Sequence, residues 1–191
     1  VEGSQVGPTE PMRTASYRGG TAIRLDGNRC VLTLPTGEAA NVASELGTAG
    51  QLGDWHLAEI AAGIPRIVAA TQEAFVPQMV NYEMAAIGGV SFQKGCYPGQ
   101  EIVARTHYLG KVKRRMYRAS LDAFAAPGTD VFTPESGEQH CGALVLTAPV
   151  SAGGYECLVV VQSSGAEAGE VHVGSPTGPR LKMLPLPYAV E

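Results

Sequence analysis

The sequence predicts an α+β chain in which a mixed region of helices and strands precedes a small antiparallel β-barrel. The barrel is predicted from six short β-rich runs that follow Gly110, with turn residues between them and no helical pattern among them. These runs are residues 113–120, 130–132, 142–147, 155–161, 170–173 and 182–184. The change in character near Leu109 and Gly110 predicts a domain boundary that divides the chain into residues 1–109 and 110–191.

The region before this boundary mixes strand patterns with helical patterns. Two strand patterns flank Asp26-Gly27-Asn28, a turn sequence that predicts a β-hairpin. Asp54 is predicted to cap the start of a helix that Gly63 ends, and another helix is predicted to open at Gly99 or Gln100. The expected segments are strands at 21–25 and 29–34, helices at 38–46, 54–62 and 100–107, an extended stretch at 74–80, and loops at 1–15 and 163–169.

Composition sets limits on the class of protein. Hydrophobic residues make up 45% of the chain, which is enough for a core, and the net charge of −4 gives no sign of a nucleic-acid or membrane surface. No apolar run approaches the roughly 20 residues that a membrane span needs, and no secretory signal is visible. The first strands and helix cannot close a core alone, and the chain starts at Val1 rather than at a methionine. We therefore expect a cytoplasmic protein whose natural chain is longer.

The four cysteines follow no metal-binding pattern. Cys30, Cys96, Cys141 and Cys157 contain no C-x-x-C pair, so neither a zinc site, a cluster-ligand set nor a disulfide framework is expected. Three of them lie in apolar runs typical of buried strands. Cys96 differs, because glycines, a lysine and a proline surround it.

Cys96 combines three features that favour a thiolate. Gly95 and Gly99 allow a tight turn and the close approach of another molecule. The predicted helix start offers unpaired N–H groups and a partial positive charge, and Lys94 adds a full charge. A lone cysteine without a visible histidine or aspartate partner is also compatible with simple packing. From the residues alone, both interpretations stay open.

The segment Lys94-Gly95-Cys96-Tyr97-x-Gly99-Gln100-Glu101-x-Val103-Ala104-Arg105 resembles the signature of the YgfZ-type folate-binding family, which is related in fold to the glycine-cleavage T-protein. The resemblance covers roughly residues 15–191. Its further segments are 62–65, 75–78 with Asn81, 88–92, Gly110 with Lys113-Arg114, and 186–188.

The resemblance implies a T-protein-like folate-binding α/β domain, incomplete at its N-terminus, followed by the β-barrel. It implies a tetrahydrofolate-dependent accessory protein that assembles, repairs or maintains [4Fe–4S] clusters in client enzymes, including radical enzymes that modify tRNA. Cys96 would be the working residue with Lys94, acting as a transient cluster ligand, a redox thiol or a folate-site residue; no permanent metal site is expected. Gln78, Asn81 and Arg105 would bind the folate or another anion, although the two amides could equally satisfy loop backbone. The supporting motif residues would be Gly95, Tyr97, Gly99, Gln100 and Glu101.

The chain departs from the family pattern at several places. Pro98 stands where the family usually has Thr, and Ala61 where it often has Glu, with Glu59 nearby. Tyr82 stands where Leu is usual. The family's N-terminal half-domain, which would supply much of the folate-facing surface, is missing.

A run of six cations, Arg105, Lys111, Lys113, Arg114, Arg115 and Arg118, contains no acid. It indicates either an anion site, for the folate glutamate tail or for RNA near a tRNA-modifying partner, or a solvated strand face after a helix end. No aromatic residues were seen to interleave with it, so direct nucleic-acid binding is not expected.

The expected partners are iron–sulfur client enzymes or assembly proteins and folate, with no membrane, for a monomeric protein. Two rival functions remain. One is a folate-dependent aminomethyltransferase or demethylase of the T-protein superfamily, and the other is a structural module that only binds partners.

Overall fold

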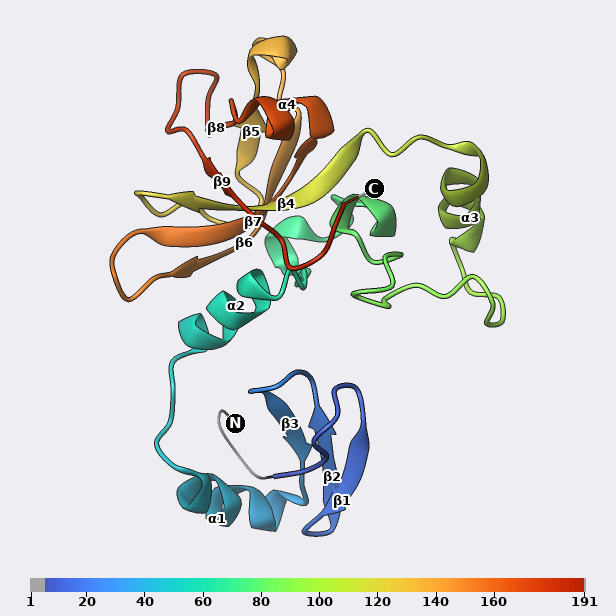
Figure 1. Cartoon of the computed structure of the whole chain (residues 1–191), viewed down its shortest axis with the longest axis vertical. Helices are drawn as coiled ribbons and strands as arrows, with labels where there is room; N and C mark the ends of the chain where they lie inside the picture. The colour runs from blue at the N-terminus through green and yellow to red at the C-terminus, as the bar shows by residue number, and fades with distance from the viewer. Residues whose placement is uncertain (1–5, 191) are drawn as a thin grey trace. The chain divides into compact units, whose positions relative to one another are not determined.

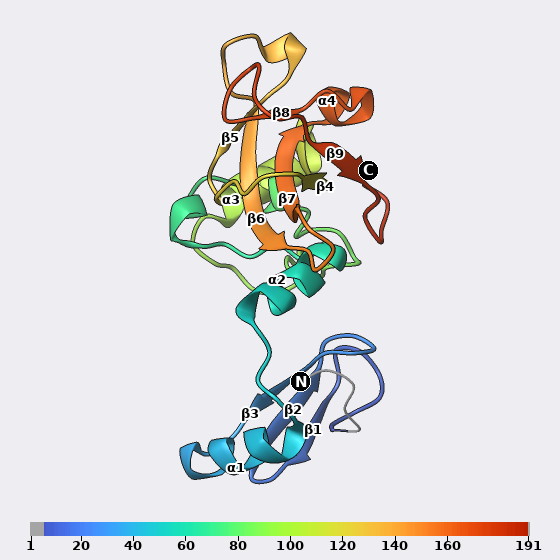
Figure 2. The same cartoon turned by 90° about the vertical axis from the view of Figure 1, so that its left-hand side faces the viewer.

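The computed structural model describes residues 6–190. The chain divides into two compact units, Val1–Gly50 and Gln51–Glu191, and each is described by itself. Figures 1 and 2 show their elements in two views.

The first unit is a three-stranded antiparallel sheet with one helix. Strands β1 (Thr14–Tyr17), β2 (Gly20–Arg24) and β3 (Cys30–Thr33) pair in sequence order, and α1 spans Thr36–Leu46. The turn between β2 and β3 is held by Asp26, whose Oδ1 accepts backbone N–H bonds from Asn28 and Arg29 at 2.9 and 2.8 Å. The predicted hairpin and helix are confirmed. The prediction of a loop at 1–15 is wrong for residues 14 and 15, which belong to β1. Residues 1–5 lie outside the described part.

The second unit begins with short helices. Helix α2 (Leu52–Ala61) is confirmed, but Gln51 rather than Asp54 caps it. Asp54 is the third helical residue, and its Oδ2 accepts the Gln51 N–H at 3.1 Å. Two 3₁₀ turns follow, η1 (Ala69–Thr71) and η2 (Pro77–Val80). The extended stretch predicted at 74–80 is therefore wrong, because a proline with its fixed φ suits the first position of a helical turn.

Helix α3 (Gln100–Leu109) begins where the sequence predicted, and a six-stranded antiparallel sheet follows it. Its strands run in the order β8-β5-β6-β7-β4-β9 and form a curled sheet (Figure 2). The backbone of residues 179–181, just before β9, also hydrogen-bonds to β8. The strands are β4 (Arg114–Leu121), β5 (Asp130–Phe132), β6 (Gly142–Pro149), β7 (Tyr155–Gln162), β8 (His172–Val173) and β9 (Lys182–Leu184), with turn η3 at Pro134–Ser136.

All six predicted β-runs are strands, but the predicted loop at 163–169 is wrong. Residues Ser163–Ala168 form helix α4, whose Gly165 and Ala166 are buried. A run of small residues therefore packs as a short helix rather than lying as a loop on the surface.

Strand β7 has both faces covered, which explains its unbroken apolar run. Cys157 and Val159 belong to a core cluster with β5 and β8, whereas Leu158 and Val160 pack with Ile60 of α2 and other residues of the opposite cluster. Residues 51–109 and the sheet thus share one compact unit. A boundary at 109/110 and a T-protein-like fold stay predictions. Among residues 6–190, no helix is both long and apolar enough to cross a membrane.

Candidate functional site

The segment that contains Cys96 lies beside a hollow of about 450 Å³. We call residues 89–99 the Cys96 loop; it has no regular secondary structure and ends where α3 begins. Cys96 is exposed, and no hydrogen bond to its Sγ is present among the described residues. The hollow is lined by Pro77, Tyr82, Gly89, Val90, Ser91, Lys94, Gly95, Cys96 and Tyr97. The predicted pair of Cys96 and Lys94 therefore borders one concave surface.

The turn into α3 depends on one glycine and one glutamine. Gly99 caps the helix with φ of +83°, a left-handed conformation that glycine adopts without a steric penalty. The Oε1 of Gln100 accepts the N–H of Tyr97 at 3.2 Å, which holds the residue after Cys96 against the helix start. Glu101 lies exposed in the first turn, where its charge suits the helix dipole. Of the neighbouring motif residues Gln100 and Glu101, Gln100 therefore makes the hydrogen bond to the Cys96 loop.

Stacked rings connect the Cys96 loop with the far end of α3. Phe92 lies parallel to His107, with ring centroids 3.9 Å apart and planes inclined by 16°. Tyr108 meets both rings edge to face, at 4.8 Å from His107 and 6.1 Å from Phe92. Nothing in the local sequence pairs Phe92 with His107, because fifteen positions and an irregular loop separate them. Their contact clamps the loop onto the helix.

Tyr82 forms the wall of the hollow against which the loop begins. A Cβ on Gly89 would lie 2.5 Å from Cδ1 of Tyr82, so only glycine fits there. The Tyr82 hydroxyl donates to the carbonyl of Pro65 at 3.1 Å, and the Tyr82 carbonyl accepts the N–H of Val90 at 3.0 Å. Burial raises the pKa of the Tyr82 hydroxyl. This residue, unusual for the family, is built into the frame of the hollow.

Asn81 is fully buried, and its amide binds the backbone of Met116. Its Nδ2 donates to the Met116 carbonyl at 2.9 Å, and its Oδ1 accepts the Met116 N–H at 3.4 Å. Nδ2 also lies 3.5 Å from the hydroxyl of Tyr188, which donates to the Gly63 carbonyl at 2.7 Å. Three motif segments far apart in the sequence thus meet around Asn81, where they connect η2, β4 and the C-terminal tail.

Gln78 is also buried and bonds within the protein. Its Nε2 donates to the Val103 carbonyl at 2.6 Å, and this bond joins η2 to α3. Its backbone carbonyl accepts Nη1 of Arg115 at 2.9 Å, and the same Nη1 pairs with Glu83. Gln78 Oε1, Glu83 Oε2 and Arg115 Nε have no protein partner although they are buried.

The structure separates the three predicted folate or anion ligands. Gln78 and Asn81 are inside the fold and do not line the hollow, whereas Arg105 lies exposed on α3. The alternative that the two amides satisfy backbone groups agrees with these contacts, but the groups lie in α3 and β4 rather than in a loop, which the local sequence does not reveal. Their role in ligand binding stays a prediction.

The other three cysteines are buried. Burial, with a smaller contribution from a neighbouring carboxylate, raises the pKa of the Cys157 thiol to about 12. Within the described part of the chain, no group of three or more His, Cys, Asp or Glu side chains is arranged to hold a metal ion. Cys96 is therefore the cysteine that another molecule can reach.

The run of cations divides into paired and unpaired members. Arg115 pairs with the partly buried Glu83, and Arg118 pairs with Glu156 at 2.6 Å. In residues 6–190, the remaining four form no ion pair. They are Arg105, Lys111, Lys113 and Arg114, on α3, on the segment after it and at the start of β4.

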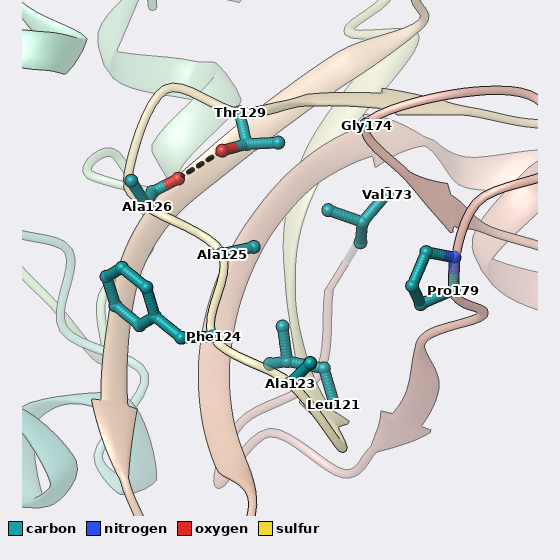
Figure 3. A pocket seen from close by; sticks show the side chains of 9 residues that line it. All are labelled: Leu121, Ala123, Phe124, Ala125, Ala126, Thr129, Val173, Gly174 and Pro179. Carbon is teal, nitrogen blue, oxygen red and sulfur yellow. Dashed lines mark hydrogen bonds between the residues drawn. The ribbon is translucent and has the colours of Figure 1, made fainter.

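A second hollow, of about 370 Å³, lies at one end of the curled sheet (Figure 3). Its lining is almost entirely apolar, and the Thr129 hydroxyl on its rim donates to the Ala126 carbonyl at 2.7 Å. None of its lining residues is titratable. The Cys96 loop, in contrast, borders a hollow lined by a cysteine and a lysine.

Comparisons with known proteins agree with the sequence resemblance. No protein-family model matches the chain. The tRNA-modifying protein YgfZ of Photobacterium profundum is 35% identical over 181 residues, which cover 90% of this chain and 54% of that protein. Proteins of the same name from Klebsiella pneumoniae (32% over 170 residues, 86% and 51%) and Vibrio vulnificus (40% over 108 residues, 56% and 33%) are also similar. The chain spans about half the length of the curated relatives that match most of it.

Proposed function

The chain belongs to the YgfZ family, and we propose that it serves in tRNA modification as an accessory factor for iron–sulfur enzymes, with Cys96 as the working thiol. The observation that carries the proposal is the exposure of Cys96 on the border of a hollow, while Cys30, Cys141 and Cys157 are buried. Lys94 lies on the same border, and α3 begins at Gln100, a few residues after Cys96.

A single accessible thiol limits the chemistry that this site can perform. Iron–sulfur clusters are usually held by four cysteine ligands, so a cluster touching Cys96 would take its other ligands from the client enzyme or from an assembly protein. A redox reaction at Cys96 would likewise form its disulfide with a second molecule, because the other cysteines are buried. Both routes make Cys96 a point of transient contact with a partner protein.

Tetrahydrofolate is the proposed small ligand, and the hollow beside Cys96 is the place that suits it better than the buried amides. Its volume of about 450 Å³ lies within the usual range of small-molecule sites, about 300–1,000 Å³. Tyr82 and Tyr97 offer aromatic surface, and Lys94 offers a charge for a carboxylate. Asn81 would have to give up its bonds to Met116 before it could bind a ligand.

The functional test uses the full-length protein in cells that lack their own YgfZ. Wild type is expected to restore methylthiolated tRNA, and Cys96→Ala is expected not to restore it. Gln93→Ala, which changes an exposed residue of the same loop, is the matched control and should restore it. Full activity of Cys96→Ala would overturn the role of the thiol.

Ligand binding is tested separately by calorimetric titration with 5-formyltetrahydrofolate, a stable form of the ligand. We expect Lys94→Ala to weaken binding and Gln93→Ala to leave it unchanged. Binding that is unaffected by Lys94→Ala but lost in a folded Gln78 variant would move the site away from the hollow. A monomeric state, a cytoplasmic location and client iron–sulfur enzymes as partners remain predictions.

A further inference from the structure

The four cations without an ion pair among residues 6–190 flank aromatic residues of α3 along the chain, and this combination points to a ligand. Tyr108 is 69% exposed on α3, next to the stacked rings of Phe92 and His107. The cations flank these rings along the chain, from Arg105 to Arg114. We call Phe92, Arg105, His107, Tyr108, Lys111, Lys113 and Arg114 the α3 surface.

We propose that the α3 surface binds single-stranded RNA through its phosphates and bases. Single-strand-binding proteins combine cations that follow the backbone with aromatic side chains on which bases stack. The α3 surface has both, and the structure supplies the aromatic component whose apparent absence argued against nucleic acid in the sequence. The proposal does not depend on Cys96 or on folate.

The charge pattern favours a polyanion over other partners. No aspartate or glutamate occurs between Glu101 and Asp122, although the whole chain carries a net charge of −4. Two nearby arginines, Arg115 and Arg118, are neutralised by carboxylates. The net negative charge of the whole chain would repel RNA. The positive electrostatic potential that could attract it is therefore confined to the α3 surface.

The arrangement of the backbone also suits an extended ligand. Helix α3 lies to one side of the curled sheet, and residues 110–113 lead from it to β4 as an irregular segment (Figure 1). Helix α3 contacts η2, and Val103 is its buried residue, so most of the helix surface faces outward. An acidic peptide would use the cations but would gain little from Tyr108, whereas a base can stack on that ring.

The test measures fluorescence polarisation of a fluorescein-labelled 20-nucleotide oligouridylate with the full chain at several salt concentrations. We expect a Kd on the order of 1–100 µM near physiological salt. Four phosphate contacts would give a slope of log K against log salt of about −3. Lys111→Ala/Lys113→Ala should reduce the slope by about 1.4, whereas Arg13→Ala/Lys182→Ala, which removes the same charge from exposed sites elsewhere, should leave it unchanged.

The aromatic contribution has its own pair of variants. Tyr108→Ala should weaken binding about tenfold. Phe124→Ala, which removes a ring 61% exposed at the other hollow, should have no effect. Circular dichroism checks that each variant is folded.

Three results would overturn the proposal. The first is the absence of oligouridylate binding at low salt. The second is an equal loss of affinity in the two charge-removing double variants. The third is binding that Tyr108→Ala leaves unchanged and that poly-L-glutamate displaces as well as RNA does, which would indicate a general site for anionic proteins.

Discussion

Replacing Asn81 tests the conclusion that this motif residue holds the fold together. In Asn81→Ala, the N–H and carbonyl of Met116, a fully buried residue, lose the partners that lie 3.4 and 2.9 Å away. An unsatisfied buried backbone group costs about 1–3 kcal/mol. Asn81 also has φ of +60°, where alanine costs roughly 1 kcal/mol more. The expected loss is therefore roughly 4 kcal/mol, out of a typical 5–15 kcal/mol.

Asn81→Gly separates the two contributions, because glycine tolerates the left-handed backbone but makes no side-chain bond. It should be more stable than Asn81→Ala by about 1 kcal/mol and still less stable than wild type. Urea unfolding followed by fluorescence of Trp55, the single tryptophan, reports the second unit. With a slope of about 2 kcal/mol per molar urea, the Ala midpoint should fall by about 2 M. A loss below about 1 kcal/mol would refute the structural role and favour Asn81 as a ligand residue.

Three further outcomes follow from the site and its surroundings. In the native protein, iodoacetamide should modify Cys96 at least about a hundredfold faster than the buried Cys157, as peptide mass spectrometry can measure; equal rates would contradict the burial pattern. Because the pKa of Cys157 is raised from 9.0 to about 12, its contribution to stability is complete below pH 9 and on the order of 4 kcal/mol is lost by pH 12; Cys157→Val should flatten this decline in urea titrations at each pH. Gly89→Ala should destabilise the protein by about 1–3 kcal/mol through its clash with Tyr82, and Tyr82→Leu should relieve part of that loss; Gly95→Ala, whose Cβ would meet open space, is the neutral control.

The sequence predicted the sheet well because its signals are local. The β-rich runs of β5 and β9 coincide with their strands, and the hairpin between β2 and β3 forms around the predicted turn. Helix α3 begins at Gln100, directly after Gly99, as predicted. The left-handed backbone of Gly99 lets the chain turn sharply before the helix.

Two predictions of secondary structure were wrong because contacts distant in the sequence decided the local conformation. Residues 74–80 were predicted as strand or extended chain interrupted by Pro77, but the fixed φ of this proline begins a 3₁₀ turn where η2 packs against β4. Residues 163–169 looked like a loop because glycine and serine dominate them, yet Ala166 is buried against the core. In both places, tertiary packing outweighed the local preference.

The candidate site likewise contains residues that local sequence could predict and residues whose contacts it could not reveal. Cys96, Lys94 and the glycines could be found because the features that favour a thiolate lie within a few residues of each other. Asn81 was predicted as a ligand because its partners, Met116 and Tyr188, lie 35 and 107 positions away in the sequence. The same separation concealed the stacking of Phe92 on His107. The motif thus did not distinguish the exposed thiol from the residues that bond within the protein.

The central claim is that Cys96 acts on the iron–sulfur cluster of a client enzyme. Its most direct test is an in vitro measurement of cluster survival in a purified tRNA-methylthiolating radical enzyme exposed to air. The visible absorbance of the cluster is followed with the full-length protein present as wild type, Cys96→Ala or Gln93→Ala. Wild type and Gln93→Ala are predicted to slow the loss of the cluster, and Cys96→Ala to have no effect. Equal protection by Cys96→Ala and wild type would contradict the account.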